Sequence, residues 1–70
     1  MTKSSQQLGL RIKELRESRK WTQRECGMYL GLNDTFLAAI ESGRKNVTLA
    51  TVEKIADGFD ITLEELFKGL

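Results

Sequence analysis

Residues 22–41, TQRECGMYLGLNDTFLAAIE, form the stretch that decides the fold. They contain the signals for two short helices joined by a tight turn. Glu25 follows Thr22 at the spacing of a capping box, in which each side chain bonds the other residue's free backbone N–H. Gly31 suits a left-handed turn, because a residue with a Cβ atom resists that conformation. Asn33 can then cap the second helix.

The apolar residues of this stretch predict the same boundaries. Trp21 and Cys26 have the spacing of a hydrophobic staple at the start of the first helix. Leu32 and Leu37 have it at the start of the second, and Gly43 ends that helix. Two helices of this size that meet across so short a turn describe a helix-turn-helix.

The chain before this stretch predicts one longer helix. Ser4 with Gln7 can cap it, and it is expected to run to about Arg19. Residues 1–4 are expected to fray. The spacing of the apolar residues predicts a buried stripe of Leu8, Ile12 and Leu15. Gly9 should weaken the helix by up to about 1 kcal/mol relative to Ala.

The chain after this stretch predicts two more helices. Thr48 can cap a fourth helix, and Thr62 with Glu65 forms a second capping box for a fifth. Gly58 and Asp60 are expected to break the fourth helix. Its predicted buried stripe is Val52, Ile55, Ala56 and Phe59. No segment alternates as a strand does, so the prediction is one all-α domain of five helices over residues 1–70.

Composition excludes several classes of function. With one cysteine and no histidine, the chain offers neither an internal disulfide nor a Cys/His metal site, and no metal, cofactor or small-molecule ligand is expected. An enzyme is rejected, because there is also no Gly-rich phosphate loop or carboxylate cluster of recognisable spacing. No apolar run approaches the roughly 20 residues of a membrane span, and no signal peptide is evident. A reducing cytoplasm is the expected compartment.

Charge is distributed unevenly along the chain. Residues 1–24 hold seven Lys and Arg against two Glu, a balance of +5. Residues 25–70 hold four basic and eight acidic side chains, a balance of −4. Such asymmetry indicates one basic and one acidic face, although an ordinary solvated surface is an alternative interpretation.

The order of these motifs resembles the Cro and phage-repressor type of helix-turn-helix domain. The resemblance rests on TQ at 22–23, the small residue Gly27, Gly31, LAAIESG at 37–43 and TLEELF at 62–67, and it covers Leu8 to about Phe67. It implies a compact five-helix, lambda-repressor-like domain. Residues 41–61, ESGRKNVTLATVEKIADGFDI, look most like the small controller proteins of restriction–modification systems, which are dimeric transcription regulators.

This resemblance implies a sequence-specific regulator that binds double-stranded operator DNA as a homodimer, with a recognition helix at about Asn33–Ser42 in the major groove. A nucleoid-associated location follows from the same role. The implied phosphate contacts are Gln23, Arg24, Ser42, Arg44, Lys45 and Asn46. The implied base-facing residues are Asp34, Thr35, Phe36, Ala38 and Ala39. An ion pair between Arg16 and Glu41 is implied as well.

Several side chains have two open roles. Thr35 can meet a base or bond the helix backbone, and Phe36 can contact DNA or fold back onto the domain. The apolar set Phe59, Leu63, Leu66, Phe67 and Leu70 can form a dimer interface or complete the core. Ala38 and Ala39 carry no hydrogen-bonding side chain, which predicts that backbone contacts and DNA shape matter more than direct base readout. A protein-binding helix-turn-helix, such as an antitoxin-like module, is the rival function.

Overall fold

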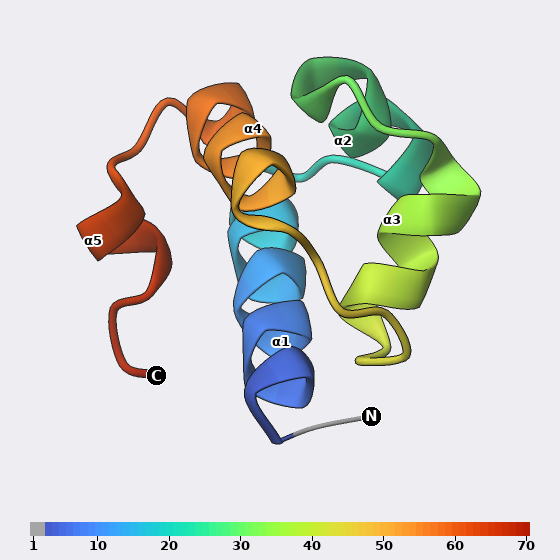
Figure 1. The fold of residues 1–70 in the computed structure, drawn as a ribbon. Helices are drawn as coiled ribbons and strands as arrows, with labels where there is room; N and C mark the ends of the chain where they lie inside the picture. The colour runs from blue at the N-terminus through green and yellow to red at the C-terminus, as the bar shows by residue number, and fades with distance from the viewer. Residues whose placement is uncertain (1–2) are drawn as a thin grey trace.

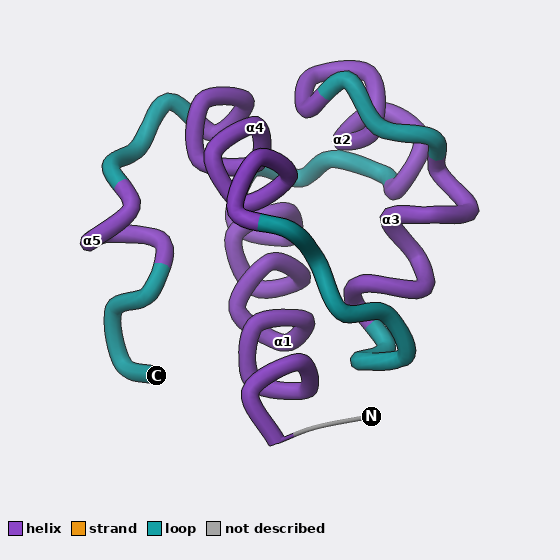
Figure 2. Tube along the Cα trace, viewed as in Figure 1, coloured by secondary structure: helices purple, strands orange, loops and turns teal. Residues whose placement is uncertain are grey.

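The computed structural model describes residues 3–70 and is built from five α-helices (Figure 1). In chain order they are α1 (Lys3–Ser18), α2 (Gln23–Leu30), α3 (Asp34–Glu41), α4 (Leu49–Phe59) and α5 (Leu63–Leu66). Figure 2 shows helices joined by short loops, with no strand in the described part of the chain. Within residues 3–70 no helix is both long and apolar enough to cross a bilayer. The all-α, five-helix prediction is confirmed.

The helices surround one small core. In Figure 1, α2 and α3 lie on one side of α1 and α5 lies on the other. Helix α3 contacts both α1 and α2, and α4 contacts α2 and α5. Every helix contributes to the buried apolar cluster, which comprises Leu8, Ile12, Cys26, Leu30, Leu37, Ile40, Val52, Ile55, Ala56, Phe59 and Leu66.

Local hydrogen bonds and backbone angles start α2, end it and start α3 where the sequence predicts. Thr22 Oγ1 accepts from Glu25 N at 3.0 Å, and Glu25 Oε1 accepts from Thr22 N at 2.8 Å, which completes the capping box. Gly31 ends α2 in the left-handed region with φ 70°. Asn33 Oδ1 accepts from Thr35 N at 2.8 Å and so caps α3. These boundaries depend on residues only a few positions apart.

The start of α1 differs from the prediction. The helix already begins at Lys3, so Ser4 lies within it and is not its cap. The expected fraying is therefore wrong for Lys3 and Ser4, while residues 1–2 lie outside the described part. A physical reason is the tie between Ser5 Oγ and Asn46 Oδ1, which anchors the first turn of α1 to the loop before α4.

Two glycines inside helices mark close approaches between helices. A Cβ atom on Gly9 would lie 2.3 Å from the carbonyl oxygen of Ile40, because α1 packs closely on the end of α3. A Cβ atom on Gly58 would lie 2.2 Å from Leu30 Cδ2. The expectation that Gly58 breaks α4 is wrong: the helix continues to Phe59 and ends where Asp60 adopts φ 57°.

Burial also divides the apolar set that was assigned to a dimer interface. Phe59 and Leu66 are fully buried within the single chain. Their assignment to an interface is wrong, because a side chain without exposed surface cannot reach a partner. Leu63, Phe67 and Leu70 keep 39%, 41% and 48% of their surface exposed. Only these three of the five therefore remain available.

Candidate nucleic-acid interface

The turn between α2 and α3 is held by close packing at Gly27. The carbonyl oxygen of Gly27 accepts from the backbone N–H groups of Gly31 and Leu32, the latter at 2.8 Å. A Cβ atom on Gly27 would lie 2.6 Å from the carbonyl oxygen of Leu32. The missing side chain therefore lets the turn fold back against α2. This contact sets the direction in which α3 leaves the turn.

Helix α3 buries one side and presents short side chains on the other. Leu37 and Ile40 are buried. On the other side of the helix, Asp34 and Thr35 are exposed, and Ala38 and Ala39 are partly exposed. Phe36 is partly buried and packs against the core. Of the two roles left open for Phe36, the structure supports packing on the domain. The exposed face is then formed by Asp34, Thr35, Ala38 and Ala39.

The loop after α3 carries the basic residues beside this face. Arg44, Lys45 and Asn46 are all exposed. Arg44 Nε donates to Ser42 Oγ at 2.8 Å, and Ser42 Oγ donates in turn to the carbonyl oxygen of Ala39 at 3.0 Å. The single hydroxyl proton of Ser42 is thus used inside the domain. In the DNA-free domain Ser42 therefore orients Arg44, and its role as a phosphate contact stays a prediction.

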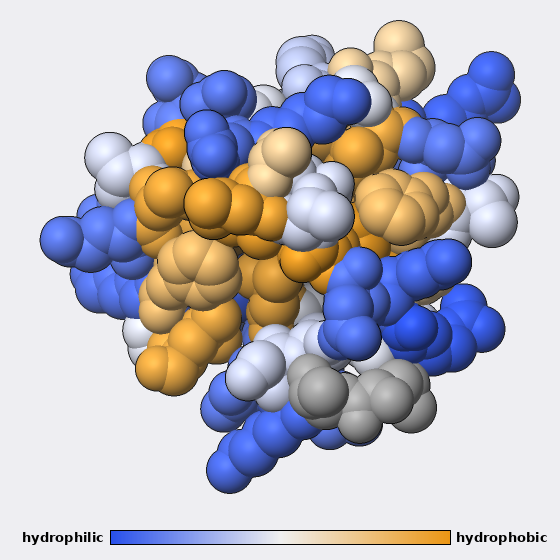
Figure 3. Space-filling view, viewed as in Figure 1, coloured by the Kyte–Doolittle hydropathy of each residue, from blue (hydrophilic) through white to orange (hydrophobic). Residues whose placement is uncertain are grey.

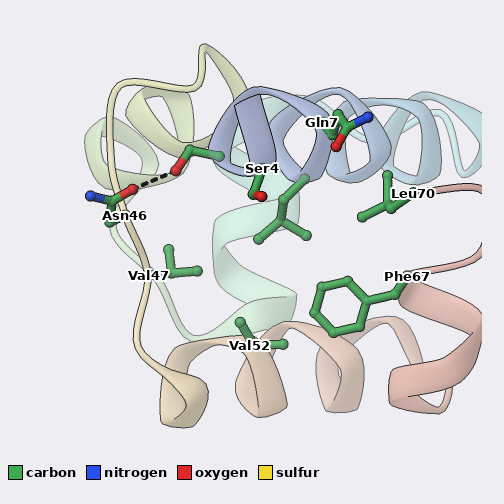
Figure 4. A pocket seen from close by; sticks show the side chains of 9 residues that line it. Ser4, Gln7, Asn46, Val47, Val52, Phe67 and Leu70 are labelled. Atoms are coloured by element: carbon green, nitrogen blue, oxygen red, sulfur yellow. Dashed lines mark hydrogen bonds between the residues drawn. The ribbon is translucent and has the colours of Figure 1, made fainter. Parts of the chain in front are cut away.

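Asn46 is also held from within the domain. Its side-chain oxygen accepts from Ser5 Oγ, and Figure 4 shows its amide nitrogen pointing away from that bond. The amide nitrogen carries two N–H donors. The link joins residues 41 positions apart in the sequence, so no local pattern could have predicted it.

Buried Glu41 joins the partly buried side chains of Arg16 and Gln23 in one network across three helices. Arg16 Nε lies 2.8 Å from Glu41 Oε2, and Arg16 Nη2 donates to Glu41 Oε1 at 3.2 Å. Gln23 Nε2 donates to the same Oε1 at 3.1 Å. Arg16 Nη1 also donates to the carbonyl oxygen of Trp21 at 2.8 Å. The structure thus contains the expected ion pair, and it adds Gln23, a predicted phosphate contact, as a third member.

The electrostatics of this network favour the charged form of Arg16. The Glu41 side chain is 4% exposed and that of Arg16 is 13% exposed. The hydrogen bond to Glu41 raises the pKa of the Arg16 guanidinium, while burial opposes this shift. Two of the three donors to the Glu41 carboxylate come from Arg16, so most of its charge is compensated within the protein.

The contacts of Trp21 and Cys26 indicate that both side chains have structural roles. The Trp21 ring stacks on Tyr29 at 4.2 Å and on Phe59 at 5.7 Å between centroids. The guanidinium of Arg19 lies 5.4 Å from the centroid of Trp21. Cys26 is fully buried, and this burial raises the pKa of its thiol to about 11. Trp21 therefore packs within the domain, and Cys26 behaves as a small buried hydrophobe.

A separate apolar surface lies around α5. Figure 3 shows hydrophobic side chains gathered over α5 and the chain end. Phe67 and Leu70 also line a groove of about 450 Å³ against the N-terminal half of α1 (Figure 4). Arg11 holds this region, since its Nη2 and Nε donate to the carbonyl oxygens of Glu65 at 2.7 Å and Leu66 at 3.1 Å. This contact spans more than 50 positions of sequence, and the sequence analysis missed it.

A capped pair of helices, a second helix with one exposed face and basic residues on the loop beside it together define a helix-turn-helix DNA-binding domain. The chain belongs to the helix-turn-helix family HTH_3, whose model matches residues 12–66. It is therefore placed among the sequence-specific DNA-binding regulators of transcription.

The similar proteins are regulators as well. The control protein C.MunI of Mycoplasma sp is 38% identical over 63 residues, which are 89% of this chain and 85% of that protein. The immunity repressor protein of Bacillus phage phi105 is 36% identical over 59 residues, which are 84% of this chain but 41% of that protein. The restriction-modification controller protein C.AhdI of Aeromonas hydrophila has a similar structure, with a TM-score of 0.88 and 30% identity over 94% of this chain and all of that one.

Proposed function

We propose that this chain is a controller-type transcription regulator that binds operator DNA as a homodimer, with α3 in the major groove. The observation that carries the proposal is the exposed face of α3, together with the N-terminus of α2, which Gln23 ties to the last residue of α3, and the basic loop that follows that helix. The similarity to control and controller proteins of nearly the same length supports it.

Phosphate binding is assigned to two places on this surface. The N-terminus of α2 offers free backbone N–H groups and the positive end of the helix dipole. Gln23 and Arg24 lie at that terminus. The exposed loop residues Arg44, Lys45 and Asn46 form the second place, with Arg44 oriented by Ser42. Contacts of this kind position the protein on the duplex but carry no sequence information directly.

Base reading is assigned to Asp34, Thr35, Ala38 and Ala39. A strong contact to a base edge usually needs a bidentate Arg, Asn or Gln, each worth about 1–3 kcal/mol of discrimination. This face has none of them, since Asn33 caps the helix. Thr35 and the alanines can meet thymine methyl groups, and Asp34 can accept from a cytosine amino group. Much of the specificity must then come from half-site spacing and DNA deformability.

The dimer is assigned to the apolar surface of α5 and the chain end. Leu63, Phe67 and Leu70 are each more than a third exposed and lie close together in sequence. A two-fold dimer would place two copies of α3 on half-sites about one helical turn apart. We expect operators with approximate two-fold symmetry.

Titration with duplex DNA at two salt concentrations tests the main proposal. Release of counterions from DNA predicts a steep loss of affinity as salt rises. Selection of bound sequences from a random pool should then return symmetric half-sites, and sedimentation should show two protomers per operator. A protein-binding helix-turn-helix would instead show no salt-dependent affinity for duplex DNA. A single protomer per operator would refute the dimer alone.

A further inference from the structure

We infer that Glu41 is a positioning residue that presents the Gln23 side chain to a DNA phosphate. This inference rests on the proposed function, since it assumes that Gln23 meets the DNA backbone. Gln23 is the first residue of α2, and its Nε2 donates to Glu41 Oε1 at 3.1 Å. An amide nitrogen carries two N–H donors. Glu41 takes one of them and leaves the other for an acceptor outside the domain.

The burial of the network explains how Glu41 can fix this orientation. The Glu41 side chain is 4% exposed, and Arg16 holds its carboxylate through two hydrogen bonds. The acceptor that faces Gln23 is therefore itself held in place by hydrogen bonds. Fixing a glutamine side chain costs conformational entropy, because several rotamers are lost. Entropy already lost in the free protein is not lost again when DNA binds, so it does not weaken binding.

Charge is the second part of the inference. A carboxylate this close to a phosphate contact would repel DNA if it were unpaired. Arg16 removes that problem, because its guanidinium binds both oxygens of Glu41. The ion pair thus supplies Gln23 with an acceptor that carries little net charge. Replacing both members of the pair removes one positive and one negative charge, so the net charge of the protein is unchanged.

The test compares the effect of Gln23→Ala in two backgrounds, using a duplex of random sequence at low salt. In the unsubstituted protein we expect Gln23→Ala to weaken binding by about tenfold, as for the loss of one hydrogen bond to a charged group. In the Arg16→Met/Glu41→Leu background we expect Gln23→Ala to weaken binding by less than about threefold, because no carboxylate is left to orient the Gln23 side chain. Lys45→Ala is the matched control and should weaken binding equally in both backgrounds.

Two further measurements separate positioning from a purely structural role. Glu41→Gln keeps a side-chain oxygen that can accept from Gln23. In a Glu41→Gln background, Gln23→Ala should therefore again weaken binding by about tenfold. In the unsubstituted protein, NMR should show that DNA shifts one of the two Nε2 protons of Gln23 while the proton facing Glu41 stays in place. The NMR measurement does not depend on whether the doubly substituted protein folds.

An equal effect of Gln23→Ala in both backgrounds would overturn the role of Glu41 and leave the proposed function intact. The role of Glu41 would also be overturned if addition of DNA leaves the chemical shifts of both side-chain amide protons of Gln23 unchanged. If the unsubstituted protein itself fails to bind the duplex, the proposed function and this inference fall together.

Discussion

The Arg16–Glu41 ion pair should contribute strongly and cooperatively to the stability of the domain. Arg16→Met would leave the Glu41 carboxylate, 4% exposed, with Gln23 as its remaining donor in the described network. Breaking a buried pair from one side typically costs about 3–5 kcal/mol. Glu41→Leu should cost towards the lower end of that range, because the Arg16 side chain is 13% exposed and keeps its bond to the carbonyl oxygen of Trp21.

The double substitution Arg16→Met/Glu41→Leu should cost much less than the sum of its parts. Two apolar side chains of similar volume can replace a buried ion pair at a cost near zero, because no charge is left unpaired. A seventy-residue domain has about 4–10 kcal/mol of stability in total, so each single variant should be close to unfolding. We therefore expect the double variant to be more stable than either single one.

Urea denaturation, followed by circular dichroism, measures the free energy of unfolding of the unsubstituted protein, the two single variants and the double variant. The pair Arg11–Glu14 provides a contrasting control: the Glu14 side chain is 72% exposed, so its i,i+3 coupling to Arg11 should be less than about 1 kcal/mol even though Arg11 also bonds backbone carbonyls of α5. If the free energies of the two single changes at Arg16 and Glu41 simply add, the two side chains do not interact, and the reasoning from burial is refuted.

The other predictions concern packing, the thiol and DNA binding. Gly9→Ala should destabilise the protein by about 1–3 kcal/mol despite the better helix propensity of Ala, because its Cβ would meet the carbonyl oxygen of Ile40 at 2.3 Å; a higher melting temperature would contradict this. Cys26 should react with a thiol reagent only after unfolding, and stability should fall as pH rises from the ordinary thiol pKa of 9.0 towards 11, since the unfolded state loses that proton first; a Cys26→Ala variant should lack this slope. Arg44→Ala should weaken binding to operator and random DNA alike and lower the salt slope by about one, whereas a loss on operator alone would indicate base contact. Ala39→Gln should create a new base preference in a selection from random DNA without lowering the melting temperature, and an unchanged preference would show that this position does not face the bases.

The sequence by itself determined the order of the helices, the N-caps of α2 to α5 and the helix-turn-helix. Thr22 with Glu25, Gly31 and Asn33 act through hydrogen bonds and backbone angles within a few residues, so their effect can be read from spacing alone. Apolar periodicity likewise identified the buried stripe of α4 and most of that of α1, where Leu15 is only partly buried, because a helix turns its side chains with a fixed period. Identification of the family followed from the same local motifs in their order.

Only the tertiary structure decided how side chains from distant positions share one site. Gly9 and Gly58 looked like weak points of helices, yet they are the places where another helix approaches closely. Spacing could not distinguish buried Leu66 from exposed Phe67, since both suit the apolar face of one short helix. Gln23 was recognisable as a helix N-terminal residue, but its bond to Glu41 spans 18 positions and exists only because α2 and α3 meet. Contacts of this kind depend on the relative placement of whole helices, which no local spacing encodes.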